Sequence, residues 1–425
     1  MPGHKGKGIL GFEPYDITEF DTADSLFEAS GIIKESEENA SLIFGANTFY
    51  STEGSSLCVR AMLYLALVYA RENRKNPRVL ALRNVHKSFV SAIALLDIEV
   101  DWLYSGENES YLSCKLDAKT LEDHLSGTSE KPCALYITSP DYLGNTLDIA
   151  SIAQVCKRHG LLLLVDNAHG AYLKFLPTSL HPIDLGADMC CDSAHKTLPA
   201  LTGAAYLHIN KNAPEMLCHN AKRAMALFAS TSPSYLILQS LDAMNKYLSG
   251  DYKVRLAELA SRLGALKNEL EAAGYTFVGN EPTKLTLYAG KYGYTGDELA
   301  KILFDKDVVC EFHDPDFIVF MLTPENSEGD ITRLRDALLS IPRREAIDLL
   351  SPKIRAAEYV MSARKALLCA SEEVSIRESI GRVLADVTMS CPPAVPILVC
   401  GERIDDDAAY AFGYYGTDTV RVVKE

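Results

Sequence analysis

The sequence predicts an α/β fold in which a mainly parallel sheet is covered by helices, followed by a smaller α+β domain and a C-terminal α/β segment. From residue 51 to residue 210, short apolar runs alternate with longer amphipathic ones, the pattern of strands joined by crossover helices. From residue 251 onward, a long amphipathic helix precedes three strand-like runs. A chain of 425 residues is long enough for two or three domains. We expect them at residues 1–250, 251–345 and 346–425.

The strands of the first domain are short apolar runs bounded by polar residues. We expect them at residues 78–84, 134–140, 161–169, 188–193 and 203–209. A helix is expected between the second and third, because Asp148 is a suitable N-cap and Gly160 a suitable end. Ligands of such sheets gather at the carboxyl ends of the strands. Residues that directly follow each strand are therefore the first candidates for chemistry.

The second half of the chain begins with a helix whose leucines lie on one face, at positions 256, 259, 263, 266 and 270. Strands are expected at residues 283–290, 308–312 and 317–324, with a helix at 295–305. A last helical stretch is expected at residues 351–386, before a proline-rich loop at 391–404.

The composition excludes several classes of protein. A net charge of -15 without a dense Lys/Arg run argues against nucleic acid. The eleven cysteines have no metal-ligand spacing, so we expect reduced thiols, no metal site and a cytoplasmic protein. The amino terminus lacks the apolar core of a signal peptide, and no apolar run is long enough to span a membrane.

An aspartate and a lysine follow two neighbouring predicted strands. Asp166 ends the run LLLLVD, and Lys196 follows the run DMCCD in the segment DSAHK. Taken alone, Asp166 could be a turn residue or a helix cap, and Lys196 could simply extend into solvent. Together they supply what a pyridoxal phosphate site requires, an amine for the Schiff base and a carboxylate for the pyridinium nitrogen.

Two further segments complete such a site. Gly54, Ser55 and Ser56 precede a long apolar helix, whose free N–H groups could bind the phosphate. The same segment is more often an ordinary N-cap. His86 follows the strand at 78–84 and could stack on a flat ring, although a lone histidine is usually structural.

The chain resembles the bacterial ornithine/lysine/arginine decarboxylases, pyridoxal phosphate enzymes with the seven-stranded, fold type I architecture of aspartate aminotransferase. The segments that carry the resemblance are PGHKGKG, RNVHKS, VDNAHG, SAHK, STSPSYLILQSLD and PPAVPILVCGE, spread over nearly the whole chain. The resemblance implies that Lys196 holds the cofactor, Asp166 pairs with the ring nitrogen and His86 stacks on the ring. It also implies catalytic or cofactor contacts for His169, His195, Ser193, Gly54, Ser55 and Ser56.

Two implied contacts lie further from the ring. Thr231 and Ser232 belong to a segment that reaches the phosphate of a neighbouring subunit in the family, which implies a homodimer with shared active sites. Glu402 matches an acidic residue of the closing loop, and we expect it near the distal cation of the substrate. The chain lacks the receiver-like domain of the larger members, so we expect no decamer. Asn167 and Cys400 depart from the family pattern and leave substrate preference open.

The implied activity is decarboxylation of a basic amino acid, arginine to agmatine or lysine to cadaverine, for polyamine synthesis. An aminotransferase or another pyridoxal phosphate lyase is the nearest alternative. Aminotransferases normally clamp the substrate carboxylate with an arginine of the small domain, yet no arginine lies between Arg262 and Arg333. A non-catalytic paralogue is the alternative of another class, although both Lys196 and Asp166 are present.

Overall fold

The computed structural model describes residues 1–20, 22–104, 110–353, 355–387 and 393–424. The chain divides into two compact units that interleave along the sequence. Unit 1 comprises Met1–Leu80, Asp117–Ser139 and Asp148–Arg255, and unit 2 comprises Ala81–Leu116, Pro140–Leu147 and Leu256–Glu425. The three consecutive domains expected from the sequence stay a prediction.

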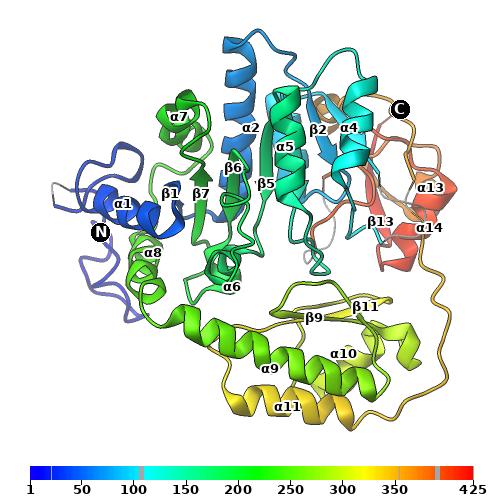
Figure 1. Ribbon diagram of the computed structural model, residues 1–425. Coiled ribbons are helices and arrows are strands. Elements are labelled where there is room, and N and C mark those ends of the chain that lie inside the picture. Colours follow the sequence, from blue (N-terminus) through cyan, green and yellow to red (C-terminus); the bar gives the residue numbers. More distant parts are fainter. Residues whose placement is uncertain (21, 105–109, 354, 388–392, 425) are drawn as a thin grey trace. The chain divides into compact units, whose positions relative to one another are not determined.

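The main sheet is mainly parallel, as expected. Its seven strands have the order β1-β7-β6-β5-β4-β2-β3 (Figure 1). β4, β5 and β6 pair in parallel, whereas β7 runs antiparallel to both β6 and β1. The five predicted strands are present as β2 (Val79–Leu82), β4 (Ala134–Thr138), β5 (Leu162–Asp166), β6 (Met189–Asp192) and β7 (Ala205–Ile209). The sequence did not predict β1 (Asn47–Ser51) and β3 (Val100–Leu103).

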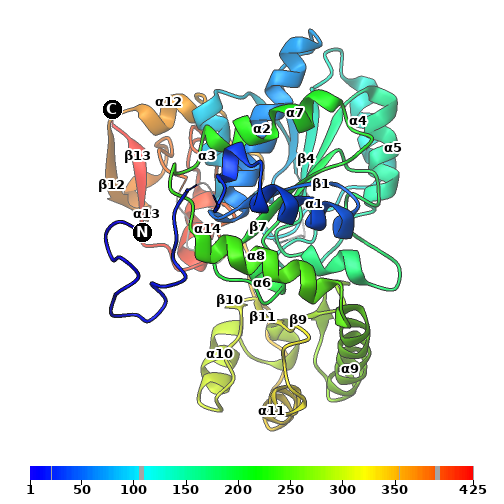
Figure 2. The same ribbon diagram turned by 90° about the vertical axis from the view of Figure 1, so that its left-hand side faces the viewer.

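Helices cover both faces of the sheet in unit 1. α2 (Gly54–Glu72) packs with α7 (Glu215–Ala226) on one face, and α4 (Ala118–Gly127) packs with α5 (Ile149–His159) on the other (Figure 2). The expected ends of α5 are confirmed, because Asp148 accepts from Ser151 N–H and Gly160 is left-handed. α1 (Ile32–Phe44) packs with α8 (Tyr235–Leu248).

Unit 2 contains a four-stranded antiparallel sheet with the order β10-β11-β9-β8. From Leu256 onward, α9 (Tyr252–Ala272) packs with α10 (Gly296–Phe304) and α11 (Glu328–Leu339) on one face of this sheet (Figure 1). The five leucines of α9 predicted to share one face are buried. The strands are β8 (Phe277–Val278), β9 (Lys284–Tyr288), β10 (Phe312–His313) and β11 (Phe317–Met321). The strand expected at 308–312 is wrong for most of its length, since only Phe312 pairs within a strand there.

The helix expected at residues 351–386 is wrong. The described part of that stretch holds two short helices, α12 (Ala363–Leu368) and α13 (Ile376–Ser379), and the strand β12 (Ser371–Ser375). β12 pairs with β13 (Thr419–Val423), a partner that no local pattern could reveal. Unit 2 also contains α3 (Lys87–Leu96) and α14 (Asp406–Tyr414), and short 3-10 turns lie at Leu26–Glu28, Ala171–Phe175 and Ala289–Tyr292. Residues 393–404 form an irregular loop, as expected, while 391 and 392 lie outside the described residues.

Two expectations about the compartment can be compared with the described ranges. The ten cysteines within them all carry free thiols, and Cys391 lies outside them. Among the described residues, no helix combines the length and the apolar character needed to cross a membrane.

Candidate active site

Two parallel strands bring the predicted amine and carboxylate to the same edge of the sheet. Asp166 is the last residue of β5, and its backbone pairs with Cys191 of β6. Just beyond the end of β6, the short helix α6 (Ala194–Thr197) carries Lys196 (Figure 1). The Nζ atom of Lys196 lies 3.0 Å from Nε2 of His169, in the turn that follows Asp166. The amine therefore lies beside the turn that follows the carboxylate.

The Asp166 carboxylate is only 3 % exposed and is held by hydrogen bonds. The Tyr136 hydroxyl donates to Oδ2 at 3.0 Å. The Ala168 N–H and the Cys191 thiol donate to Oδ1 at 3.2 and 3.6 Å. Burial, followed by the charge of Asp166, raises the pKa of Tyr136 well above its usual value, so Tyr136 keeps its proton as a donor. A buried carboxylate with such donors is suited to hold a cationic ring nitrogen.

The start of α2 is the segment where the sequence predicts phosphate binding. Gly54 has a φ of +71°, and its N–H donates to the Gly203 carbonyl at 2.8 Å. Gly203 is required there, because a Cβ atom would lie 2.8 Å from the Thr52 carbonyl oxygen. The Ser193 hydroxyl donates to the Ser55 hydroxyl at 2.8 Å and so joins the start of α2 to the end of β6.

The hydroxyl groups and the free N–H groups of this helix start fit a phosphate. Ser56 is half-buried in the first turn of α2, beside Ser55. With Lys196 and Asp166 in the same unit, the residues present fit pyridoxal phosphate: an amine, a buried carboxylate and a phosphate cradle.

His195 holds α6 in place. Its Nδ1 donates to the Ala204 carbonyl at 2.9 Å, which ties α6 to the segment before β7. Burial lowers the pKa of His195 despite that hydrogen bond, and the charge of Lys196 lowers it further. A neutral imidazole is therefore expected at neutral pH, and direct contact with the cofactor stays a prediction.

Thr231 and Ser232 lie in the exposed loop between α7 and α8. Within this loop, the Ser230 N–H donates to Oε1 of Glu53 at 2.7 Å. Glu53 directly precedes Gly54, so Ser230 lies beside the segment proposed to hold the phosphate in its own chain. The contact of Thr231 and Ser232 with a neighbouring subunit stays a prediction.

His86 belongs to unit 2, where it is the N-cap of α3. Its Nδ1 accepts from the Ser88 N–H at 3.1 Å and lies 2.8 Å from the Ser88 hydroxyl. These bonds fix the plane of the imidazole ring. Stacking of His86 on a cofactor stays a prediction.

Glu402 is buried and paired with a cation of its own unit. Its Oε2 accepts from the Val399 N–H at 2.7 Å and lies 3.4 Å from Nη2 of Arg83. Arg83 also donates to the carbonyls of Pro396 and Ile397, both at 3.0 Å. The loop that carries Glu402 is thus fastened to the end of β2, and a substrate cation would compete with Arg83 for this carboxylate. The predicted substrate contact of Glu402 stays a prediction.

Sequence reasoning missed Tyr136, Arg83 and Asp192. Tyr136 lies inside a predicted strand, where nothing local reveals its partner Asp166. Arg83 directly follows β2 and was visible as a charge at a strand end. Asp192 directly precedes Ser193 and is completely buried; its position four residues before Lys196 was the available signal.

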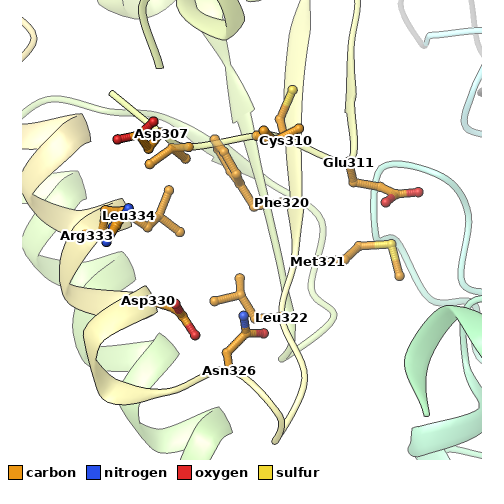
Figure 3. Close-up of a pocket in the computed structure, with 12 residues that line it drawn as sticks. Asp307, Cys310, Glu311, Phe320, Met321, Leu322, Asn326, Asp330, Arg333 and Leu334 are labelled. Carbon is orange, nitrogen blue, oxygen red and sulfur yellow. The ribbon is translucent and has the colours of Figure 1, made fainter. Parts of the chain in front are cut away.

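A separate pocket of about 520 Å³ lies on the small sheet of unit 2 (Figure 3). The side chains that line it come from β11, from α11 and from the segment before β10, and include Asp307, Cys310, Glu311, Asp330 and Arg333. None of the site residues predicted from the sequence lines this pocket.

The chain is similar to known proteins over nearly its whole length. Residues 12–273 match the family model "Orn/Lys/Arg decarboxylase, major domain", and residues 351–417 match its C-terminal domain. The arginine decarboxylase of Bacillus subtilis is 29% identical, covering 97% of this chain and 89% of its own. The arginine decarboxylase of Halalkalibacterium halodurans is 28% identical, covering 96% and 87%.

The solved structures show the same fold. The constitutive lysine decarboxylase of Escherichia coli has a TM-score of 0.77 at 18% identity, covering 100% of this chain and 79% of that chain. A serine palmitoyltransferase of Sphingomonas wittichii has a TM-score of 0.57 at 15% identity, covering 75% of this chain and 78% of that chain.

Proposed function

Because this chain belongs to the Orn/Lys/Arg decarboxylase family and is a carboxy-lyase that uses pyridoxal phosphate on a basic amino acid, we propose that its substrate is arginine, with agmatine as the product. The observation that carries the choice is the length of the similarity. Curated arginine decarboxylases of Bacillus and Halalkalibacterium cover 94% to 97% of this chain. The lysine decarboxylase of Pseudomonas aeruginosa covers 53% of it and the biodegradative arginine decarboxylase of Escherichia coli covers 55%, so the near-full-length relatives given above are arginine decarboxylases. Polyamine synthesis is the proposed role of the product.

Lys196 and Asp166 are proposed to divide the chemistry. Bound at this edge of the sheet, pyridoxal phosphate supplies an electron-accepting ring for the electron pair left when carbon dioxide departs. The amine of Lys196 would hold the cofactor and yield its place to the substrate amine. Asp166, held by the hydroxyl of Tyr136, would pair with the protonated ring nitrogen.

His169 is proposed to move a proton. Its Nε2 lies 3.0 Å from Nζ of Lys196, within hydrogen-bonding distance. A lysine amine and an imidazole in contact can exchange a proton, and either could return one to the α-carbon after decarboxylation. His86 is proposed to stack on the ring and to hold it flat.

The phosphate is proposed to bind at the start of α2. Ser55, Ser56 and Ser193 offer hydroxyl donors there, and Gly54 fixes the turn that precedes them. Thr231 and Ser232 would add donors from a second subunit, which requires a homodimer. Together with a cytoplasmic location, this assembly is part of the proposal.

A fold type I aminotransferase is the competing function. The described strands of the small sheet carry no arginine, because none occurs between Arg262 and Arg333. An enzyme that expels the α-carboxylate does not need the clamp that an aminotransferase uses.

Two measurements test the proposal. The purified chain should show the long-wavelength absorbance of a protein-bound cofactor, Lys196→Ala should lose it, and Lys211→Ala, at an exposed lysine beyond β7, should keep it. Carbon dioxide release should then be fastest from arginine when arginine, lysine and ornithine are compared. Absence of the absorbance from the wild type, or faster release from lysine or ornithine, would contradict the proposal.

A further inference from the structure

We propose that Asp192 is a positioning residue, whose buried carboxylate holds the end of β5, which carries Asp166, beside the segment that leads to Lys196. Asp192 is the last residue of β6, four residues before Lys196, and its side chain is fully buried. The inference rests on the proposed roles of Asp166 and Lys196, and it assigns a function to a residue that would not touch substrate or cofactor.

The contacts of Asp192 bridge the ends of neighbouring strands. Its Oδ1 accepts from Nδ2 of Asn167 at 2.7 Å. Asn167 directly follows Asp166, and its own N–H donates to the Cys191 carbonyl at 3.0 Å. One side-chain bond and one backbone bond therefore fix the residue after Asp166 to the last two residues of β6. A shift of Asn167 relative to the end of β6 would break these bonds.

Two buried histidines complete the contacts of the Asp192 carboxylate. The Asp192 Oδ2 lies 3.0 Å from Nε2 of His181 and 3.2 Å from Nε2 of His208. Because a carboxylate only accepts, both imidazoles must donate through Nε2. The Nδ1 of His208 lies 2.9 Å from the Thr48 hydroxyl, which then donates to it. The network thus reaches from β5 and β6 to β7 and, through Thr48, to β1.

Asp192 is ionised in this network. Burial alone would raise its pKa, but the two imidazoles and their hydrogen bonds outweigh burial and leave the pKa well below its usual value. Burial lowers the pKa of His208, although Asp192 opposes the shift, so His208 is neutral. Burying an anion costs free energy unless hydrogen-bond donors satisfy it, and here three donors do so. The positions of the donors, Asn167 among them, are therefore tightly defined.

Metal binding is the alternative use of these side chains. Cys190 Sγ lies 4.0 Å from Nε2 of His181, and His181, Cys190 and Asp192 could together hold an ion. However, hydrogen bonds already engage both Asp192 oxygens and the Nε2 atoms of both histidines. The donors therefore satisfy the carboxylate without a cation.

Asp192→Asn tests the inference because it keeps the shape and removes the charge. An amide offers one acceptor oxygen and would turn its NH₂ group toward at least one N–H donor. Asp188→Asn is the matched control. Asp188 lies just before β6 and accepts from the Leu163 N–H at 2.8 Å, so it joins the same two strands at their other end.

The first measurement is the affinity of cofactor-stripped full-length protein for pyridoxal phosphate, by fluorescence titration. We expect Asp192→Asn to weaken it about tenfold and Asp188→Asn to change it by less than about twofold. The second measurement needs no cofactor. An amine-specific reagent modifies Lys196, and mass spectrometry measures the rate. We expect this rate to change by about threefold in Asp192→Asn and to stay unchanged in Asp188→Asn.

The outcomes separate the inference from the proposed function. If the wild type binds no cofactor, the proposed function fails, while the Lys196 modification rates still test the inference. The inference would be overturned if the two variants had equal effects in both assays, or if Asp192→Asn had no effect. A stoichiometric metal ion in the purified protein would also overturn it. If Asp192→Asn does not fold, Asn167→Ala removes the same hydrogen bond by deleting its donor. An unchanged cofactor affinity and an unchanged Lys196 modification rate in Asn167→Ala would then overturn the inference.

Discussion

Tyr136→Phe is the substitution that most directly tests how the fold prepares Asp166. The change removes a single hydroxyl from β4 and keeps the ring that packs in the sheet. That hydroxyl donates to Oδ2 of Asp166 at 3.0 Å, whereas the Ala168 and Cys191 donors both bond Oδ1. The variant therefore leaves Oδ2 of a carboxylate that is 3 % exposed without its donor.

The size of the effect follows from the charge of the acceptor. A hydrogen bond to a charged group contributes roughly 1.5–3 kcal/mol. If the proposed interaction of Asp166 with the ring nitrogen depends on this bond, kcat/KM should fall by about 10- to 100-fold. Cofactor affinity should fall in the same direction, because the carboxylate loses the donor that holds Oδ2 in place.

The assay is carbon dioxide release from arginine, with cofactor affinity measured in parallel. Tyr206→Phe is the control, because Tyr206 lies in β7 of the same sheet, is fully buried, and its hydroxyl has no hydrogen-bond partner among the described residues. Tyr206→Phe should keep kcat/KM within about twofold of wild type. The reasoning is refuted if Tyr136→Phe does the same, or if both variants lose activity equally.

Three further predictions concern stability. Glu402→Gln leaves the buried Arg83 without its carboxylate, so the free energy of unfolding in urea should fall by about 3 kcal/mol. A decrease below about 1 kcal/mol would contradict the pairing. Gly54→Ala should lower the free energy of unfolding by about 1–2 kcal/mol, because φ is +71° and no neighbour lies within 4 Å of the added Cβ. Gly54→Asn should lower it less, because asparagine tolerates the left-handed region better, and equal decreases would contradict a backbone cause. Burial and then Asp316 raise the pKa of Asp314 to about 7 from 3.8, so the folded state binds a proton that the unfolded state releases. Stability should therefore fall as pH rises from about 4 to about 7; Asp314→Asn should flatten that fall, and an unchanged pH slope would refute the assignment.

Local signals in the sequence predicted much of the fold. The run LLLLVD is too short and too apolar for a surface helix, and it forms β5 (Leu162–Asp166). Asp148 and Gly160 bound α5 because a cap needs only its own turn. The leucines of α9 are buried because their spacing places them on one face. Each of these features depends on residues within one or two helical turns.

The failures arose where a distant partner decides the structure. Residues 351–386 contain β12 because its backbone pairs with β13, which no nearby residue announces. Residues 308–311 pair too little to form a strand, although their composition favours one. The pairing of Glu402 with Arg83, more than three hundred positions earlier, was not predicted either, because no residue near Glu402 indicates it.

By itself, the sequence determined which chemical groups follow which strands, including the amine of Lys196 and the carboxylate of Asp166, because strand ends and helix caps are local properties. The tertiary structure decided what surrounds those groups. Tyr136 and Asp192 act on the edge of the sheet through partners 30 and 25 residues away, Asp166 and Asn167. Such contacts form only when the strands pair, since register across a sheet is set by the packing of the whole domain.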